Sequence, residues 1–140
     1  MQVKEIMSKS PLTIEMDTPL KEIKNIFDNI RIHHVLVVDE GKLFGIISDR
    51  DLLFALSPHI GTTAETTRDL ATLNKKAHQI LTRKPVTISP NASIYDAIGI
   101  FNQQDISCLP VTDENQKAIG ILSWRDIFNV IEQNSINKTS

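Results

Sequence analysis

The phrase GIISDRD at Gly45–Asp51 returns as GILSWRD at Gly120–Asp126. Each copy is a glycine followed by two apolar residues and then Ser-x-Arg-Asp. The match continues outward, because an offset of 74 residues lays PLTI (11–14) on PVTI (85–88), and one extra residue near Asn115 raises the offset to 75. The chain is therefore predicted to be a tandem of two related repeats. Repeats this small bury their apolar faces best when they pack together.

Each repeat is predicted to run strand, helix, strand, strand, helix. A proline-led extended segment comes first, and apolar residues at helical spacing over 20–30 and 94–101 then predict a helix. The segments 33–48 and 108–123 are typical of β-hairpins, and a second helix follows at about 49–56 and 124–132. The predicted fold class is therefore mixed α/β (α+β).

The repeats set the predicted domain boundaries. Repeat 1 covers residues 1–57, a partly helical connector covers 58–76, repeat 2 covers 77–134, and residues 135–140 form a tail that we expect to be frayed.

The composition is that of an ordinary globular protein with little net charge. Fifteen basic residues against seventeen acidic residues give a net charge of −2, which argues against nucleic acid or an anionic membrane as a partner.

Cys108 is the single cysteine and cannot form an internal disulfide, so a reducing compartment is expected. No apolar run is long enough to span a membrane, and the N-terminus does not resemble a signal peptide. We expect a cytoplasmic protein.

Ser-x-Arg-Asp has a simple structural interpretation. Ser48 with Asp51, and Ser123 with Asp126, have the spacing of a capping box, in which the serine and the acidic residue satisfy amides at the start of a helix. The arginine between them would then be solvated. Ser-x-x-Asp alone is a weak signal, and capping is its commonest cause.

The same residues also fit a nucleotide. A helix N-terminus after a strand offers unpaired amides to a phosphate, and serine and arginine can add hydrogen bonds to it. An aspartate there would repel phosphate but suits the hydroxyls of a ribose. Gly45 and Gly120 would let a backbone or a base approach closely. The spacing does not choose between the two interpretations.

The whole chain resembles a tandem pair of CBS domains, a family named after cystathionine beta-synthase. GIISDRD and GILSWRD match that family's motif of glycine, two hydrophobic residues, Ser/Thr, two residues of any kind and Asp, and the match covers about residues 3–132. The resemblance implies two β-α-β-β-α CBS repeats packed as a pseudo-twofold pair. The stand-alone architecture and the long connector are similar to small bacterial proteins of the acetoin-utilisation type.

Similarity to CBS pairs implies that adenosine-containing ligands bind in two clefts between the repeats. In that family each cleft joins the motif of one repeat to the first strand and the hairpin entrance of the other. The aspartate would hold the ribose, the serine and basic groups the phosphates, and Ile14 or Val86 would pack on adenine. Carried over, one cleft has Ser123, Arg125 and Asp126 facing Thr13, Ile14, His33 and His34, and the other has Ser48, Arg50 and Asp51 facing Val86, Thr87, Ser107 and Cys108.

Two positions depart from the family pattern. Leu36 has Pro110 as its counterpart in repeat 2, and Trp124 stands inside one motif, where its bulk could cap or block a cleft.

The remaining reactive side chains have ordinary interpretations beside the functional ones. Successive strand residues point to opposite faces, so at most one of His33 and His34 faces a given ligand, and an ordinary surface histidine is equally compatible. The four histidines have no metal-ligand spacing, so no metal site is expected. Cys108 is expected to be a buried strand residue rather than a nucleophile.

The predicted function is regulatory rather than catalytic. We find no Walker-type loop, HExxH or GxSxG, so no enzyme is expected. The first hypothesis is a homodimeric sensor without a cofactor that binds AMP, ADP or ATP and reports adenylate level to another protein or pathway. The alternative is a ligand-free dimerisation or scaffold module.

Overall fold

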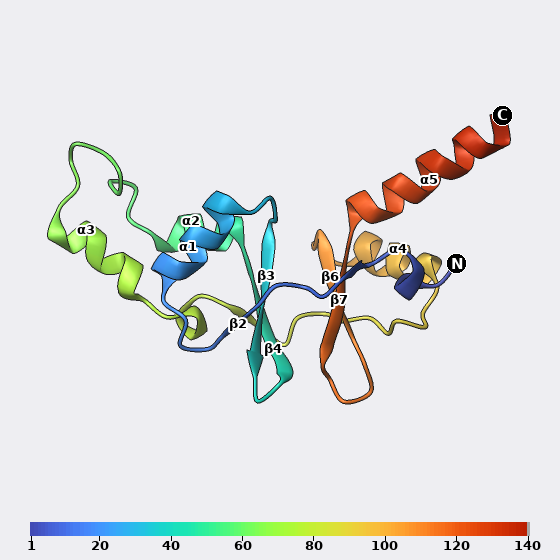
Figure 1. Ribbon diagram of the computed structural model, residues 1–140, viewed down its shortest axis with the longest axis horizontal. Coiled ribbons are helices and arrows are strands. Elements are labelled where there is room, and N and C mark those ends of the chain that lie inside the picture. The colour runs from blue at the N-terminus through green and yellow to red at the C-terminus, as the bar shows by residue number, and fades with distance from the viewer. Residues whose placement is uncertain (140) are drawn as a thin grey trace. The chain divides into compact units, whose positions relative to one another are not determined.

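The computed structural model describes residues 1–139 of the chain and the side chains of residues 1–136, and it divides into two compact units (Figure 1). Unit 1 combines residues 1–11 with the residues from 85 onward, and unit 2 comprises residues 12–84. Each unit therefore contains most of one repeat together with the leading segment of the other.

Unit 2 is built on a four-stranded sheet. The strand order is β2-β3-β4-β5; β2 is parallel to β3, and the other pairs are antiparallel. The elements in chain order are β2 (Thr13–Glu15), α1 (Leu20–Asn29), β3 (His34–Asp39), β4 (Lys42–Ser48), α2 (Asp49–Ala55), α3 (Thr67–Ala71), the 3-10 turns Thr72–Asn74 and Ala77–Gln79, and β5 (Thr82–Arg83).

Unit 1 is built on a three-stranded antiparallel sheet of order β1-β7-β6. Its elements are a 3-10 turn (Val3–Glu5), β1 (Ser8–Lys9), α4 (Ile94–Gln103), β6 (Cys108–Thr112), β7 (Ala118–Ser123) and α5 (Trp124–Thr139). The mixed helix and strand content confirms the predicted fold class.

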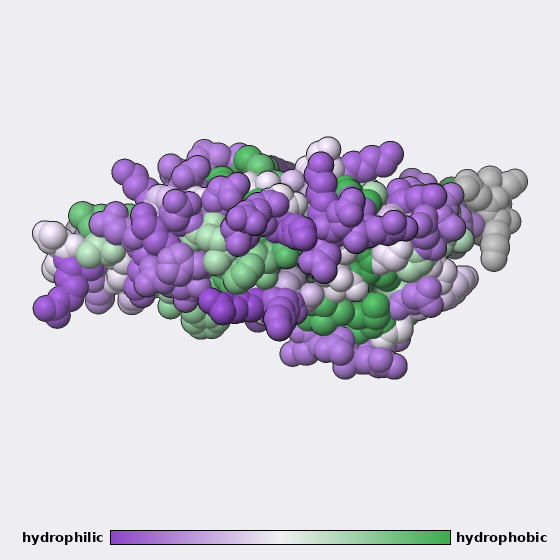
Figure 2. Space-filling view, turned by 90° about the horizontal axis from the view of Figure 1, so that it is seen from below, coloured by the Kyte–Doolittle hydropathy of each residue, from purple (hydrophilic) through white to green (hydrophobic). Residues whose placement is uncertain are grey.

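Each unit has its own hydrophobic core. In unit 2 the core joins Ile23 of α1 to Val35 and Ile47 of the hairpin, and all three side chains are fully buried. In unit 1 the core is formed around Leu109 and Leu122 of the corresponding hairpin. Three consecutive residues of β3, Val35, Leu36 and Val37, are fully buried, so β3 is covered on both faces, and the helical spacing of apolar residues gives α1 its buried face. Hydrophilic residues cover most of the molecular face in Figure 2, where hydrophobic residues gather in separate patches.

The leading segments of the two repeats are exchanged between the units. Val3 is fully buried in the core of unit 1, and Ala77, its counterpart at the offset of 74, is fully buried in the core of unit 2. The two-residue strand β1 pairs with β7 in unit 1, whereas β5 pairs with β4 in unit 2. The sequence did not predict either strand.

The helices and hairpins lie close to their predicted positions, with two differences. Helix α5 continues to Thr139, so the prediction that it ends near Glu132 is wrong, and residues 135–139 of the predicted frayed tail are helical. Ser140 lies outside the described residues. The connector is tied down by a hydrogen bond of 2.7 Å from the Ser57 hydroxyl to Asp69, and its α-helix is only five residues long.

The two repeats differ at their first strand because of Pro110. Leu36 N–H donates to the Leu12 carbonyl over 3.1 Å, which holds β2 beside β3. Proline has no N–H and cannot make the corresponding bond. The counterpart segment of repeat 2 therefore pairs only through an isolated bridge between Ile88 and Val111.

No helix in the described part of the chain is long and apolar enough to cross a bilayer.

Candidate functional site

Both Ser-x-Arg-Asp motifs form the capping boxes that the sequence predicts. In unit 2, Asp51 N–H donates to Ser48 Oγ over 3.0 Å and Ser48 N–H donates to Asp51 Oδ2 over 2.9 Å. In unit 1, Ser123 N–H donates to Asp126 Oδ2 over 2.9 Å, and Asp126 N–H donates to Ser123 Oγ over a longer 3.4 Å. The structural interpretation of the motif is confirmed in both units.

Capping leaves binding capacity at each motif. It uses Oδ2 of each aspartate, and within the described residues neither Oδ1 accepts a hydrogen bond. A carboxylate can accept several hydrogen bonds, so a ribose hydroxyl could add to the cap without breaking it. Arg50 and Arg125 are exposed and have no ion-pair partner among the described residues. Capping and ligand binding are thus chemically compatible.

His33 is joined to the start of α2. Its Nδ1 lies 2.9 Å from Asp49 Oδ2, and its carbonyl accepts the Asp49 N–H over 2.9 Å. His34 begins β3 and lies opposite Ser48 in the β3–β4 ladder. Burial lowers the pKa of His34, against the opposing effect of the carboxylates of Asp49 and Asp51. His34 is thus the partly buried histidine beside the motif, and His33 is the exposed one.

We predict that unit 2 loses stability in mild acid because of His34. Its pKa in the folded state lies below the ordinary value of 6.5, so the unfolded chain binds more protons once the pH falls below that value. The free energy of unfolding should therefore decrease as pH drops through about 6.5, with no contribution from His34 well above it. Urea unfolding of the intact protein over a pH series measures this effect.

The matched variants for this pH series are His34→Gln and His78→Gln. His34→Gln should weaken the loss of stability between neutral and mildly acidic pH, whereas His78→Gln, at an exposed histidine, should retain it. Equal pH dependence in the wild type and in His34→Gln would show that this prediction is wrong.

The predicted ligand residues on the strands of unit 1 include one that is buried, Cys108, and two that are exposed, Val86 and Thr87. Cys108 is buried opposite Ser123 in the β6–β7 ladder, and burial raises the pKa of its thiol to about 12, so it is a neutral core residue at physiological pH. The Ser107 carbonyl accepts the Trp124 N–H over 3.4 Å. Val86, which is 38% exposed, and Thr87 precede the bridge at Ile88. Thr87 is also exposed, so both side chains are accessible within their unit.

On the first strand of unit 2, Thr13 is exposed, whereas Ile14 is only 7% exposed and packs in the core. The structure thus brings the predicted residues of β2, β3 and the first motif together in unit 2, and the others together in unit 1. The two ligand clefts, which would each join residues of unit 1 to residues of unit 2, stay a prediction.

Sequence reasoning missed the partner of His33 and the partner of Trp124. Asp49 and Trp124 occupy the same variable position of the two motifs. In unit 2 this position forms the His33–Asp49 pair, and in unit 1 the Trp124 ring packs edge-on against Phe101, with ring centroids 6.3 Å apart. The difference between the motifs was visible in the sequence, but the contacts were not.

The described residues contain no cluster of three His, Cys, Asp or Glu side chains that could hold a metal ion.

Known proteins resemble this chain over its whole length. The family model of the CBS domain matches residues 3–58 and 77–133. A CBS domain-containing protein of Dictyostelium discoideum is 34% identical over 131 residues, which is 92% of this chain and 90% of that protein. Several other curated relatives are longer proteins, some with enzyme names, of which the chain spans between 22% and 46%.

Solved structures show the same fold. A protein described as a putative acetoin utilization protein, AcuB, from Vibrio cholerae superposes with a TM-score of 0.79 at 23% identity, covering 100% of this chain and 97% of that one. The CBS domain pair of protein MJ0100, solved in complex with 5′-methylthioadenosine and S-adenosyl-L-methionine, has a TM-score of 0.76 at 29% identity, covering 96% of this chain and 98% of that one. These neighbours confirm the prediction of a two-repeat pair.

Proposed function

Because the chain belongs to the CBS domain family and carries two copies of the domain, we propose that it is a regulatory module that binds an adenosine-containing ligand. The MJ0100 domain pair, which is 29% identical to this chain, was solved with two such ligands. Support also comes from the chain itself, since both motifs are intact and both retain an unused carboxylate oxygen among the described contacts.

The observation that carries the proposal is that each motif, a glycine, two apolar residues and Ser-x-Arg-Asp, holds an exposed arginine that its cap does not need. Ser93 and Asp96 cap α4 with the same geometry, at 3.0 and 3.1 Å, yet no arginine lies between them. A cap therefore needs only the serine and the aspartate. The exposed arginines Arg50 and Arg125 have no role in capping, and they are the residues that a phosphate would use. Arg68 stands at the same place in the cap Thr66–Asp69, but that cap lacks the glycine and the two apolar residues that precede both motifs.

In the proposed sites each group has a distinct task. Asp51 and Asp126 accept hydrogen bonds from ribose hydroxyls through Oδ1, and the arginines bind phosphate oxygens. Ser48 can donate its hydroxyl hydrogen to a phosphate, whereas Ser123 must first rotate away from Asp126 Oδ2, 3.2 Å distant. Because Ile14 is in the core, Val86 is the better placed of the two predicted adenine contacts.

The proposed output is a shift of population rather than catalysis. A ligand that binds one arrangement of the chain more tightly than another stabilises that arrangement, and the shift is limited by the difference in affinity. The proposed ligand class is AMP, ADP or ATP together with other adenosine derivatives, and the signal passes to another protein that recognises the favoured arrangement.

We also propose that the protein is a homodimer. Leu53 and Phe54 of α2 are 73% and 83% exposed, and Phe128 of α5 is 62% exposed. Large apolar side chains grouped on exposed helices are typical of protein interfaces.

The test of ligand binding is calorimetric titration of the intact protein with AMP, ADP, ATP, S-adenosylmethionine and 5′-methylthioadenosine, with adenosine as the control without phosphate. We expect one member of the panel to bind. Asp51→Ala or Asp126→Ala should weaken that binding by about 10- to 100-fold, since hydrogen bonds to a charged group contribute about 1.5–3 kcal/mol.

Asp96→Ala is the matched control. It removes a cap of the same geometry, so it should cost about 1 kcal/mol of stability, as the motif variants do, and leave the affinity unchanged. Unchanged ligand affinity in Asp51→Ala and Asp126→Ala would show that the two motifs act only as helix caps. Absence of binding across the panel by a folded dimer would favour the scaffold function instead.

A further inference from the structure

The side chain of Met7 lies directly against the glycine that begins the second motif. A Cβ atom added to Gly120 would clash with the Met7 sulfur and would lie 3.0 Å from Met7 Cγ. Met7 is partly buried and packs against the hydrophobic core of unit 1. Its N–H donates to the Val3 carbonyl over 3.0 Å, and the next residue, Ser8, pairs with Ile121 of β7. The Met7 thioether is therefore part of the contact that holds the leading segment in unit 1.

Unit 2 has a hydrocarbon side chain at the corresponding place. Leu81 is the counterpart of Met7 at the offset of 74, and its Cδ1 would lie 2.9 Å from a Cβ atom added to Gly45. It also packs against the core of its own unit. Leucine and methionine have similar volumes and replace one another in cores at little cost, but only the thioether can be oxidised. The same packing contact is therefore open to oxidation in unit 1 and inert in unit 2.

The other sulfur atoms of the chain lie in different surroundings. Met1 is 57% exposed, so an oxygen added to it disturbs little packing. Met16 packs against the core of unit 2. Cys108 is in unit 1, but burial raises the pKa of its thiol to about 12, and the thiolate that reacts with peroxide is therefore scarce. Met7 is thus the sulfur through which an oxidant can act on the packing of unit 1.

We propose that Met7 is a site of reversible oxidation by hydrogen peroxide, and that the methionine sulfoxide loosens the leading segment from unit 1. The sulfur attacks one peroxide oxygen, the O–O bond breaks, an S–O bond forms and the other oxygen leaves as water. The sulfur loses two electrons and the peroxide gains them; a methionine sulfoxide reductase reverses the change. The added oxygen is polar and enlarges a group that already lies against Gly120, so the oxidised side chain is expected to leave the core.

Loosening at Met7 reaches the second motif through strand β7. The leading segment pairs with β7 at Ser8 and Lys9, and β7 ends at Ser123, which caps α5. Oxidation in the leading segment therefore acts on the strand that positions this cap. The inference depends neither on nucleotide binding nor on the proposed homodimer, because its test is made on the protein alone.

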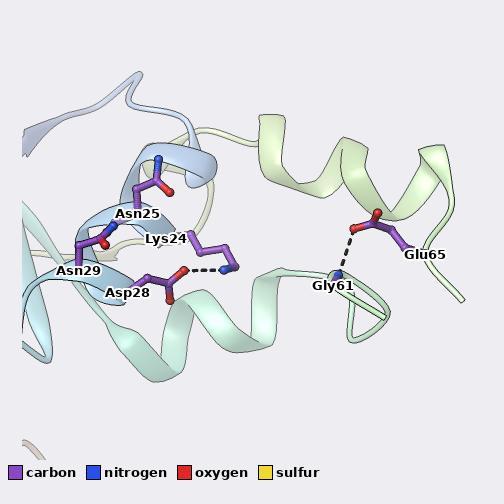
Figure 3. A network of polar contacts seen from close by, with 6 residues as sticks. All are labelled: Lys24, Asn25, Asp28, Asn29, Gly61 and Glu65. Carbon is purple, nitrogen blue, oxygen red and sulfur yellow. Dashed lines mark hydrogen bonds and ion pairs between the residues drawn. The ribbon is translucent and has the colours of Figure 1, made fainter. Parts of the chain in front are cut away.

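The test combines peroxide treatment of the intact protein with mass spectrometry and amide hydrogen exchange. Mass spectrometry should find a sulfoxide at Met7, and amides of β6 and β7 should then exchange about tenfold faster, because their unit opens more often. Exchange in β3 and β4 should not change. Unit 2 is a suitable reference because its polar contacts, such as Lys24 with Asp28 and the Gly61 N–H with Glu65 over 3.1 Å, contain no sulfur (Figure 3). Treatment with the reductase should restore slow exchange.

The matched variants are Met7→Leu and Met16→Leu. Met7→Leu places in unit 1 the side chain that unit 2 has at Leu81, so β6 and β7 should stay protected both before and after peroxide. Met16→Leu removes the sulfur that packs on the core of unit 2 and should leave the response of unit 1 as it is in the wild type.

Three results would overturn the inference. Met7 could stay reduced at peroxide concentrations that oxidise Met1, which would show that the fold protects its sulfur. A sulfoxide at Met7 with unchanged exchange in β6 and β7 would show that unit 1 tolerates the added oxygen. Equal acceleration of exchange in the wild type and in Met7→Leu would place the sensitive group elsewhere in the chain.

Discussion

A chain that lacks residues 1–10 is expected to lose the folded structure of unit 1 and to keep that of unit 2. The removed segment carries Val3, which is fully buried in the core of unit 1, and strand β1, which pairs with β7. It also carries the Val3 and Lys4 amides, which donate to the carbonyls of Ala92 and Pro90 over 2.8 and 2.9 Å.

The expected size of this effect is several kcal/mol. Burying a valine contributes about 1.5–3 kcal/mol, and each hydrogen bond adds about 0.5–1.5 kcal/mol. Since a domain of this size is stable by only about 5–15 kcal/mol, the loss is a large fraction of the total. Most chain termini can be removed at little cost, so the effect is specific to a segment that enters a core.

Amide hydrogen exchange of the two units measures the outcome. Protection in β6 and β7 should fall steeply in the truncated chain, while protection in β3 and β4 should persist because unit 2, residues 12–84, contains none of the removed residues. Val3→Ala in the full chain should reproduce part of the effect, about 1–3 kcal/mol. Lys9→Ala, at an exposed position, is the control. Unchanged protection in the truncated chain would show that the exchanged segment does not stabilise unit 1.

The larger elements could be predicted because their apolar residues recur in the sequence with a regular spacing. Helical spacing marked α1 and α4, and the doubled phrase located both hairpins and the helices after them. Strands β1 and β5 are two residues long, too short to show an alternating pattern. The end of α5 was missed because the polar residues after Glu132 were interpreted as a tail, although no glycine or proline stops the helix there.

In the candidate site, too, local contacts could be predicted from the sequence and contacts between distant residues could not. The capping boxes were predictable because they depend on four consecutive residues, whose spacing is visible in the sequence. The His33–Asp49 contact joins residues that are 16 positions apart, and the Trp124–Phe101 contact joins residues from different helices. Such contacts depend on how α1 and α4 pack beside the helix starts, which no local pattern specifies. Physical reasoning from the residues predicted the caps, whereas the proposed ligand class came from the resemblance to a known family.

The second large effect is expected at Gly45, the first residue of the doubled phrase. A Cβ atom at this position would lie 2.7 Å from the carbonyl oxygen of Thr82 and 2.9 Å from Cδ1 of Leu81. The leucine can move, but the oxygen belongs to β5, whose register against β4 places Arg83 opposite Gly45. Gly45→Ala should therefore destabilise unit 2 by about 1–3 kcal/mol, as overpacked cores do. Urea unfolding of the intact protein measures the difference.

Gly99→Ala is the same chemical change at a position with nothing within 4 Å of the added atom. Because Gly99 is in the interior of α4, alanine there should stabilise the protein by about 0.5–1 kcal/mol. Opposite signs for the two variants would establish close backbone approach as the reason for glycine at position 45. Equal effects would contradict it.

The contacts of Gly45 also indicate why both copies of the doubled phrase begin with a glycine. The sequence suggested that the glycine of each motif admits a backbone or a base, and in both units the neighbour is the exchanged leading segment. At Gly45 it is the Thr82 carbonyl of β5 together with the Leu81 side chain. At Gly120 it is the Met7 side chain together with the Ser8 carbonyl of β1, whose oxygen would lie 3.0 Å from an added Cβ atom. The glycine thus accommodates the exchanged leading segment, while the serine and aspartate cap the next helix. Among the described residues, only the arginine of the phrase has no structural task in either unit. A loss of nucleotide affinity that is confined to the Asp51 and Asp126 variants, with Gly45→Ala affecting stability alone, would therefore separate the packing role of the phrase from its proposed binding role.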